Sequence, residues 1–166
     1  MNDILKNFYS EEEKREVLSV IVINKESVLS RIVDLFSARG YNIDSLTVAP
    51  IPNSEFSRIT IITIGNARVI DQIVKQLNKL VPVLKVTEHS NVIEKDTVLI
   101  KVPLDQSLSD VDVLARAYNG AIQNVTEDAI VISATDSPSR IQNFIKVMQK
   151  FNPVEIVRSG VVAMER

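Results

Sequence analysis

The sequence has few residues that supply reactive groups: among its 166 residues are no cysteine, no tryptophan and one histidine. Without cysteine, the chain has no disulfide bond, no thiol nucleophile and no sulfur ligand for a metal ion. Its four glycines are Gly40, Gly65, Gly120 and Gly160. At this spacing they form neither a GxGxxG motif nor a Walker A loop, so the common phosphate-binding loops are absent. The chain therefore offers little for a metal centre, a covalent mechanism or a nucleotide site.

An excess of positive charge is also missing, since 19 lysine and arginine residues are balanced by 21 aspartate and glutamate residues. A net charge of −2 gives no general attraction to polyphosphate. The expected strand that starts at Phe56 has no further aromatic residue on which an RNA base would stack, so we expect no nucleic-acid partner. No apolar run approaches the length of a membrane span, and Met1–Glu16 lacks the apolar stretch of a signal peptide. We expect a cytoplasmic protein without a membrane anchor.

What the sequence does contain is a repeated order of secondary structure. Short β-branched runs predict strands, and apolar residues three and four positions apart predict helices. In the first half we expect strands at 17–23, 43–51, 56–64 and 83–87, and helices at 28–39 and 67–80. In the second half we expect strands at 97–102, 121–125, 129–134 and 154–162, and helices at 109–119 and 137–150. Both halves follow the order βαββαβ, which predicts an α+β protein with two ferredoxin-like domains.

Local signals refine this prediction. Ser27 is expected to cap the first helix, and Gly40 and Gly120 are expected to end the helices that precede them. Two helices cover only one face of a sheet, so the other face of the first sheet should carry apolar side chains for a partner. The residues we assign to that face are Leu46, Val48, Ile62 and Ile64. The expected segments are a flexible N-terminal extension (1–16), a first domain (17–90) and a second domain (91–166).

The titratable residues form no catalytic constellation. His89 follows a predicted strand and is expected to be a surface or boundary residue, because no second histidine or cysteine accompanies it. Neighbouring acids occur at Glu11–Glu13, at Asp110 with Asp112, and at Glu127 with Asp128. They fall in the N-terminal tail, at a helix start and in a turn, where solvated carboxylates are the expected interpretation.

Two turns have the chemistry to hold a small amino acid. The first, 24–29, leads into a helix whose first N–H groups and positive dipole end suit a carboxylate. In the second, 40–43, the side chain of Asn42 can accept a hydrogen bond from an ammonium group. The aliphatic residues that would surround a short side chain are Val28, Leu29 and Ile43. The residues alone favour a simpler interpretation, in which Asn24 and Asn42 are turn residues and the aliphatic side chains belong to the core.

Several runs of the sequence carry a resemblance to a known family. They are LSVIVINKESVLSRIVDLFSARGYNIDSLTVAP, SRITIITIG, QIVKQLNKLVPVLKV and, at the end of the chain, RSGVVAMER. The sequence resembles the regulatory small subunits of acetohydroxyacid synthase, also called acetolactate synthase. The resemblance covers nearly everything after the N-terminal extension and is looser between residues 97 and 150. It implies that the first domain is an ACT domain and that the chain is not itself an enzyme.

The resemblance also implies partners. Small subunits of this family bind a catalytic large subunit, raise its activity and confer feedback inhibition by valine in branched-chain amino-acid biosynthesis. The chain is expected to hold no cofactor, whereas thiamine diphosphate, Mg and FAD are expected on the large subunit. The ACT domains are expected to form a homodimer with the effector at the interface. Carried onto this sequence, the site comprises Asn24, Val28 and Leu29 of one chain and Asn42 and Ile43 of the other.

One departure from the family concerns Ser27, which stands where the family turn has glycine. Glycine permits close approach of the backbone to a ligand, whereas serine adds a Cβ and a hydroxyl group. We therefore include Ser27 in the effector site and expect weaker or altered valine binding. The main rival hypothesis is a stand-alone amino-acid sensor of the ACT type that regulates a different partner. An independent enzyme is disfavoured by the missing nucleophile, metal and cofactor motifs.

Overall fold

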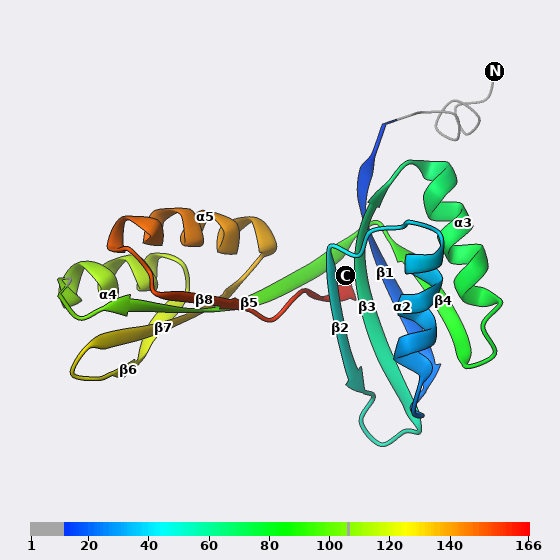
Figure 1. Ribbon diagram of the computed structural model, residues 1–166, viewed down its shortest axis with the longest axis horizontal. Coiled ribbons are helices and arrows are strands. Elements are labelled where there is room, and N and C mark those ends of the chain that lie inside the picture. Colours follow the sequence, from blue (N-terminus) through cyan, green and yellow to red (C-terminus); the bar gives the residue numbers. More distant parts are fainter. Residues whose placement is uncertain (1–11, 106) are drawn as a thin grey trace. The chain divides into compact units, whose positions relative to one another are not determined.

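The computed structural model describes residues 12–105 and 107–166 (Figure 1). They form two compact units: the first contains the described residues up to Val92 together with Glu165 and Arg166, and the second spans Ile93–Met164. Of the expected N-terminal extension, residues 1–11 lie outside the described residues. In the part of the chain that the structure describes, no helix is both long and apolar enough to cross a membrane.

The first unit is a four-stranded antiparallel sheet with two helices on one face (Figure 1). Its elements are β1 (Lys14–Ile23), α2 (Val28–Ala38), β2 (Ser45–Pro50), β3 (Phe56–Gly65), α3 (Ala67–Asn78) and β4 (Val83–His89). The strands lie in the order β2-β3-β1-β4, so the predicted βαββαβ order closes into a ferredoxin-like sheet with β1 and β3 at its centre.

Alternation along the two central strands explains where the core of the first unit lies. Leu18 of β1 lies opposite Ile61 of β3, Val20 lies opposite Ile59, and all four side chains are buried against the helices. The helices add buried residues at helical spacing, which are Val28, Ile32, Leu35 and Phe36 from α2 and Ile70, Ile73 and Leu77 from α3. The strand period of two and the helix period of 3.6 therefore supply one shared core.

Of the four residues predicted for the helix-free face of this sheet, Ile62 and Ile64 lie on it, whereas Leu46 and Val48 do not. Leu46 and Val48 pair with β3 residues whose side chains face the helices, so both lie on the helix side, and Leu46 packs against the core. Ile62 lies on the opposite face but is fully buried, whereas Ile64 on that same face is exposed. The error is one of strand register, because a shift of one residue moves a side chain to the other face of the sheet.

The second unit repeats the arrangement, which confirms the predicted fold class. Its elements are β5 (Val92–Pro103), α4 (Leu108–Ala117), β6 (Gly120–Val125), β7 (Ala129–Asp136), α5 (Pro138–Met148), the 3-10 helix η1 (Gln149–Phe151), β8 (Glu155–Arg158) and β9 (Val162–Glu165). Four strands follow the order β6-β7-β5-β8, and β9 pairs with β5 outside this order. Buried residues of β5, β7 and both helices form the core, including Ile100, Ile132 and Phe144.

The largest differences from the predicted strand boundaries concern β1, β5 and the last expected strand. β1 starts at Lys14 inside the expected extension, because residues 14–16 pair with the end of β3. β5 starts at Val92, within the polar stretch where no strand was expected. The last expected strand, 154–162, is broken into β8 and β9, and Gly160 between them has a φ of 89°. A positive φ interrupts an extended strand, and apolar periodicity does not reveal it.

The two glycines expected to end helices have different roles. Gly40 follows α2 with a φ of 67°, as predicted. After α4, however, the positive φ of 55° belongs to Asn119, and Gly120 is the first residue of β6. A Cβ on Gly120 would lie 2.6 Å from the carbonyl oxygen of Ser133 and 2.9 Å from that of Ala115. Gly120 therefore permits a close backbone approach and does not supply the left-handed turn.

Candidate functional site

The turn 24–29 joins β1 to α2 at the end of the sheet where β3 begins. Just beyond the last β1–β3 pair, formed by Ile23 and Phe56, the N–H of Asn24 donates to the carbonyl oxygen of Glu55 at 2.8 Å. The side chains of Asn24 and Ser27 are exposed. The backbone of the turn is thus held by the sheet, while the side chains of Asn24 and Ser27 face solvent.

Ser27 has a left-handed backbone conformation, with a φ of 65° and a ψ of 1°. It occupies the predicted N-cap position of α2, but its hydroxyl makes no capping hydrogen bond, so that part of the prediction is wrong. A capping side chain needs an extended N-cap backbone to reach the second or third N–H of the helix. The carbonyl oxygen of Ser27 accepts from the hydroxyl of Ser30 at 2.9 Å and from the N–H of Arg31 at 3.2 Å.

The N-terminus of α2 consequently lacks a capping side chain. In contrast, the side chain of Asn66 caps α3 by accepting from the N–H of Val69 at 3.0 Å. The first turn of α2 also contains no acidic residue to offset the positive end of the helix dipole. This end of α2 is therefore suited to an anion such as a carboxylate.

The second predicted segment, 40–43, follows the other end of α2. The carbonyl oxygen of Asn42 accepts from the hydroxyl of Thr63 at 2.7 Å, so this segment is held against the end of β3. The side chain of Asn42 is exposed, and Ile43 is half-buried against the core. Asn42 therefore presents its amide to solvent from a fixed backbone position.

Within one chain, the two segments lie at opposite ends of the sheet. The turn that contains Asn24 is bonded beside Phe56, whereas Asn42 is bonded to Thr63. Phe56 and Thr63 are seven positions apart on β3, which corresponds to about 23 Å of strand. The structure does not bring Asn24 and Asn42 together in a single chain, so a site that uses both segments needs two chains.

The aliphatic residues of the predicted site divide into buried and exposed side chains. Val28 lies in the core beneath α2, so its side chain cannot line an open pocket in this chain. Its neighbour Leu29 is 37% exposed. Val33, which was not among the predicted site residues, lies one helical turn beyond Leu29 and is 40% exposed. Val48, predicted on the other face, is 47% exposed and lies on the helix side of the edge strand β2.

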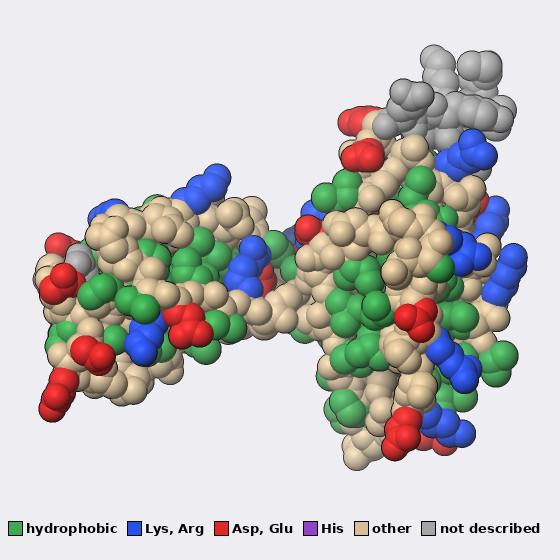
Figure 2. Space-filling model, viewed as in Figure 1, with side chains coloured by type: hydrophobic (Ala, Val, Ile, Leu, Met, Phe, Trp, Pro, Cys, Tyr) green, Lys and Arg blue, Asp and Glu red, His purple; other side chains and the backbone are tan. Residues whose placement is uncertain are grey.

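Leu29, Val33 and Val48 define an exposed apolar edge of the first unit, carried by α2 and β2. Figure 2 shows hydrophobic side chains gathered over these two elements. The spacing of Leu29 and Val33, four residues apart, was the available sequence signal, since it puts both on one helix face. An apolar edge of this kind marks an interaction surface.

Comparisons with known proteins decide the family. The family of AHAS small subunit-like ACT domains matches residues 18–85, and the family described as the small subunit of acetolactate synthase matches residues 95–166. The chain is 37% identical to the acetolactate synthase isozyme 3 small subunit of Escherichia coli, over 92% of this chain and 96% of that protein. The chain belongs to the acetolactate synthase small-subunit family. It is also 40% identical to the small subunit of Haemophilus influenzae, with 92% and 96% coverage.

A solved structure supports this membership. The crystal structure of the acetolactate synthase small subunit from Thermotoga maritima matches with a TM-score of 0.86 and 35% identity, covering 92% of this chain and 98% of that one. The ACT domain match contains every residue of the predicted effector site. Membership in a small-subunit family implies a catalytic large subunit as partner and a regulatory role for this chain.

His89 is a boundary residue whose ring points inward in the ACT domain. Its Nε2 lies 2.9 Å from the hydroxyl of Ser19, and its side chain is almost fully buried. Nδ1 has no hydrogen bond and lies 3.9 Å from the exposed carboxylate of Glu165. Among residues 12–105 and 107–166, no group of three or more histidine, cysteine, aspartate or glutamate side chains is arranged to hold a metal ion.

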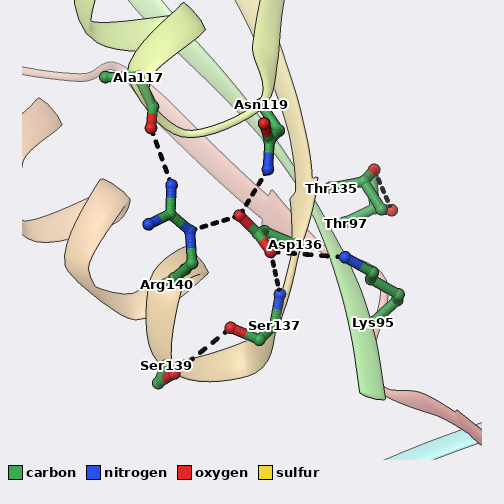
Figure 3. A network of polar contacts seen from close by, with 9 residues as sticks. All are labelled: Lys95, Thr97, Ala117, Asn119, Thr135, Asp136, Ser137, Ser139 and Arg140. Carbon is green, nitrogen blue, oxygen red and sulfur yellow. Dashed lines mark hydrogen bonds and ion pairs between the residues drawn. The ribbon is translucent and has the colours of Figure 1, made fainter. Parts of the chain in front are cut away.

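Asp136, at the end of β7, is the centre of a polar network in the second unit of this small subunit (Figure 3). Its carboxylate accepts from Arg140 Nε at 2.5 Å, from the N–H of Ser137 at 2.8 Å and from Asn119 Nδ2 at 2.9 Å. Lys95 Nζ lies 3.5 Å away. The hydrogen bond from Arg140, followed by that from Ser137, lowers the pKa of Asp136 to about 2. Because its partners come from β5, α5 and the end of α4, we assign this network a structural role.

Proposed function

We propose that this chain is a regulatory subunit that binds the large subunit of acetolactate synthase, raises its activity and makes it sensitive to valine. The observation that carries the proposal is the separation of Asn24 from Asn42 across one ACT sheet. A homodimer with a two-fold axis beside β2 reverses the direction of the second sheet. The turn before α2 of one chain then faces the Asn42 segment of the other, and each dimer has two complete effector sites.

The exposed apolar edge supports this mode of dimerisation. Leu29, Val33 and Val48 lie where a second α2 and a second β2 would pack in such a dimer. β2 is also an edge strand of its sheet, which is the position at which a strand of a second chain can pair. Burial of the apolar side chains would stabilise the pair of chains, since each loses apolar surface to the other.

The two segments supply complementary groups for valine. The uncapped N-terminus of α2 attracts the carboxylate, and the amide oxygen of Asn42 from the partner accepts from the ammonium group. Leu29 and Ile43 contact the isopropyl group. The Cβ and hydroxyl of Ser27 lie at the carboxylate end, where they narrow the space and weaken valine binding relative to a glycine. Thiamine diphosphate, Mg and FAD belong on the large subunit in this proposal, and the assembly is cytoplasmic.

Reconstitution with a purified acetolactate synthase large subunit tests the proposal. Acetolactate formation from pyruvate is measured with and without this chain, and then over a range of valine concentrations. We expect the chain to raise the rate and valine to lower it. The Asn42→Ala variant should raise the valine concentration for half-inhibition about tenfold, since one hydrogen bond to a charged group is lost, and should leave activation unchanged.

The matched control is Asn53→Gly, which changes an exposed asparagine in the turn between β2 and β3, outside the site. Its valine response should equal that of the unaltered chain. If the chain neither co-elutes with the large subunit nor raises its rate, the large subunit is not its partner, and the stand-alone amino-acid sensor is favoured. Activation of the large subunit without any response to valine would refute valine as the effector but would leave the large subunit as the partner.

A further inference from the structure

The helix-free face of the second sheet contains a small apolar hollow. Its floor is formed by Leu99 of β5, Val131 of β7 and Val157 of β8, and the hollow has a volume of about 200 Å³. Successive side chains of a strand point to opposite faces of the sheet. The neighbours of these three residues, such as Ile100, Ile132 and Ile156, pack in the core, so the three side chains point to the helix-free face. Leu99 on the central strand β5 and Val157 opposite it on the outer strand β8 are 44% and 49% exposed, so they form a pair of adjacent aliphatic side chains open to solvent.

Two opposite charges border this hollow. Lys101 of β5 and Glu155 of β8 line it and lie opposite each other in strand register, on the same face as the apolar floor. Elsewhere in the second unit, charged side chains pair directly, as Arg158 does with Asp96 and Arg140 with Asp136. Lys101 and Glu155 form no such pair with each other in the described part of the chain.

The surroundings limit how large an occupant can be. On this face Thr97 is next to Leu99 along β5, and Ser133 and then Thr135 follow Val131 along β7. The hydroxyls of Thr97 and Thr135 are joined by a hydrogen bond of 2.8 Å. The apolar floor is thus confined to three side chains, whereas a stable protein interface buries about 800 Å² on each partner. A hollow of about 200 Å³ is also smaller than the usual ligand pocket of about 300 Å³ or more. These features favour a compact molecule over a protein surface.

We propose that the hollow binds an aliphatic α-amino acid in its zwitterionic form. The ammonium group of Lys101 contacts the ligand carboxylate, the carboxylate of Glu155 contacts the ligand ammonium group, and the aliphatic side chain covers Leu99, Val131 and Val157. The pKa of Asp128 is lowered mainly by the hydrogen bond from the Thr126 hydroxyl and least by the charge of Lys101, so Lys101 and Asp128 interact only weakly. This second site does not depend on the ACT effector site of the proposed function, because no residue is shared.

The test uses the full chain with ¹³C-labelled methyl groups, titrated with leucine and followed by NMR. Binding in the hollow shifts the methyl signals of Leu99, Val131 and Val157. Two analogues of leucine test whether both of its charged groups are needed for binding. In 4-methylpentanoate the ammonium group is missing, and in isoamylamine the carboxylate is missing. Each should bind about tenfold more weakly than leucine. Lys101→Met and Glu155→Gln should weaken leucine binding by a similar factor, whereas Lys146→Met on the exposed side of α5 should not.

The outcomes separate this proposal from the ACT site. Shifts at Leu29 without shifts at the three floor residues would overturn the second site and leave the ACT site intact. Shifts at the floor residues alone would support the second site and count against the ACT site. Equal binding of leucine and isoamylamine would refute zwitterion recognition. Shifts of the floor residues only upon addition of the large subunit would show that this face binds a protein.

Discussion

Replacing Ser27 with glycine should both stabilise the ACT domain and strengthen valine binding. Ser27 has a φ of 65°, and a non-glycine residue in this left-handed region is destabilised by about 1–2 kcal/mol. Glycine removes that strain but loses about 0.5–1 kcal/mol through the greater freedom of the unfolded chain. The side chain of Ser27 makes no capping hydrogen bond that would be lost. The net expectation is a gain of about 0.5–1 kcal/mol, or about 2–8 °C in melting temperature.

Asn53→Gly is the matched control, because Asn53 is exposed and has a similar φ of 56°. Asparagine adopts the left-handed conformation more readily than serine, so this change should have almost no effect on stability. Thermal unfolding followed by circular dichroism compares the three proteins, and calorimetric titration with valine, leucine and isoleucine compares their ligand binding. The reasoning fails if Ser27→Gly lowers the melting temperature, or if it and the unaltered chain bind valine equally tightly.

Two further substitutions examine the second unit by urea unfolding. Asp136→Asn removes the charge that accepts from Arg140 and should destabilise the unit by about 2–3 kcal/mol, whereas Asp112→Asn, at a more exposed ion pair, should cost less than about 1 kcal/mol. The pKa of Asp136 is lowered to about 2, so its charge contributes fully to the free energy of unfolding above about pH 4, and this contribution is lost as the pH falls towards 2. The difference in stability between Asp136→Asn and the unaltered chain should therefore vanish near pH 2. Gly120→Ala, which forces a Cβ against two carbonyl oxygens, should cost about 2–3 kcal/mol. Gly40→Ala, with open space but a φ of 67°, should cost about 1 kcal/mol, and equal effects at the two glycines would contradict this assignment.

The repeat of βαββαβ was predictable because its signals are local. Continuous β-branched runs such as 17–23 form central strands, and apolar stripes such as Ile70, Ile73 and Leu77 form the buried face of a helix. Their order along the chain, together with short connections, leaves few ways to close a sheet. The fold class follows from these patterns.

Properties that depend on register or on a single dihedral angle were not predictable. Leu46 and Val48 were placed on the wrong face, since alternation within β2 is weak and the pairing with β3 decides which side is buried. The left-handed conformation of Ser27 also has no sequence signal, because serine is a common N-cap and only the backbone shows that its side chain does not act as one. The family resemblance drew attention to this position through the glycine that is missing there.

The distance between the two halves of the effector site has a consequence for regulation. One chain contributes an uncapped helix end that favours a carboxylate, and the other contributes Asn42, which accepts from an ammonium group. An amino acid that contacts both halves binds one arrangement of the dimer more tightly than any arrangement in which the halves are apart. That difference in affinity is the free energy available for allosteric control, and a tenfold preference corresponds to about 1.4 kcal/mol. Ser27 lies at one of the two contacts, so in this proposal the residue that departs from the family also sets how strongly valine can shift the dimer.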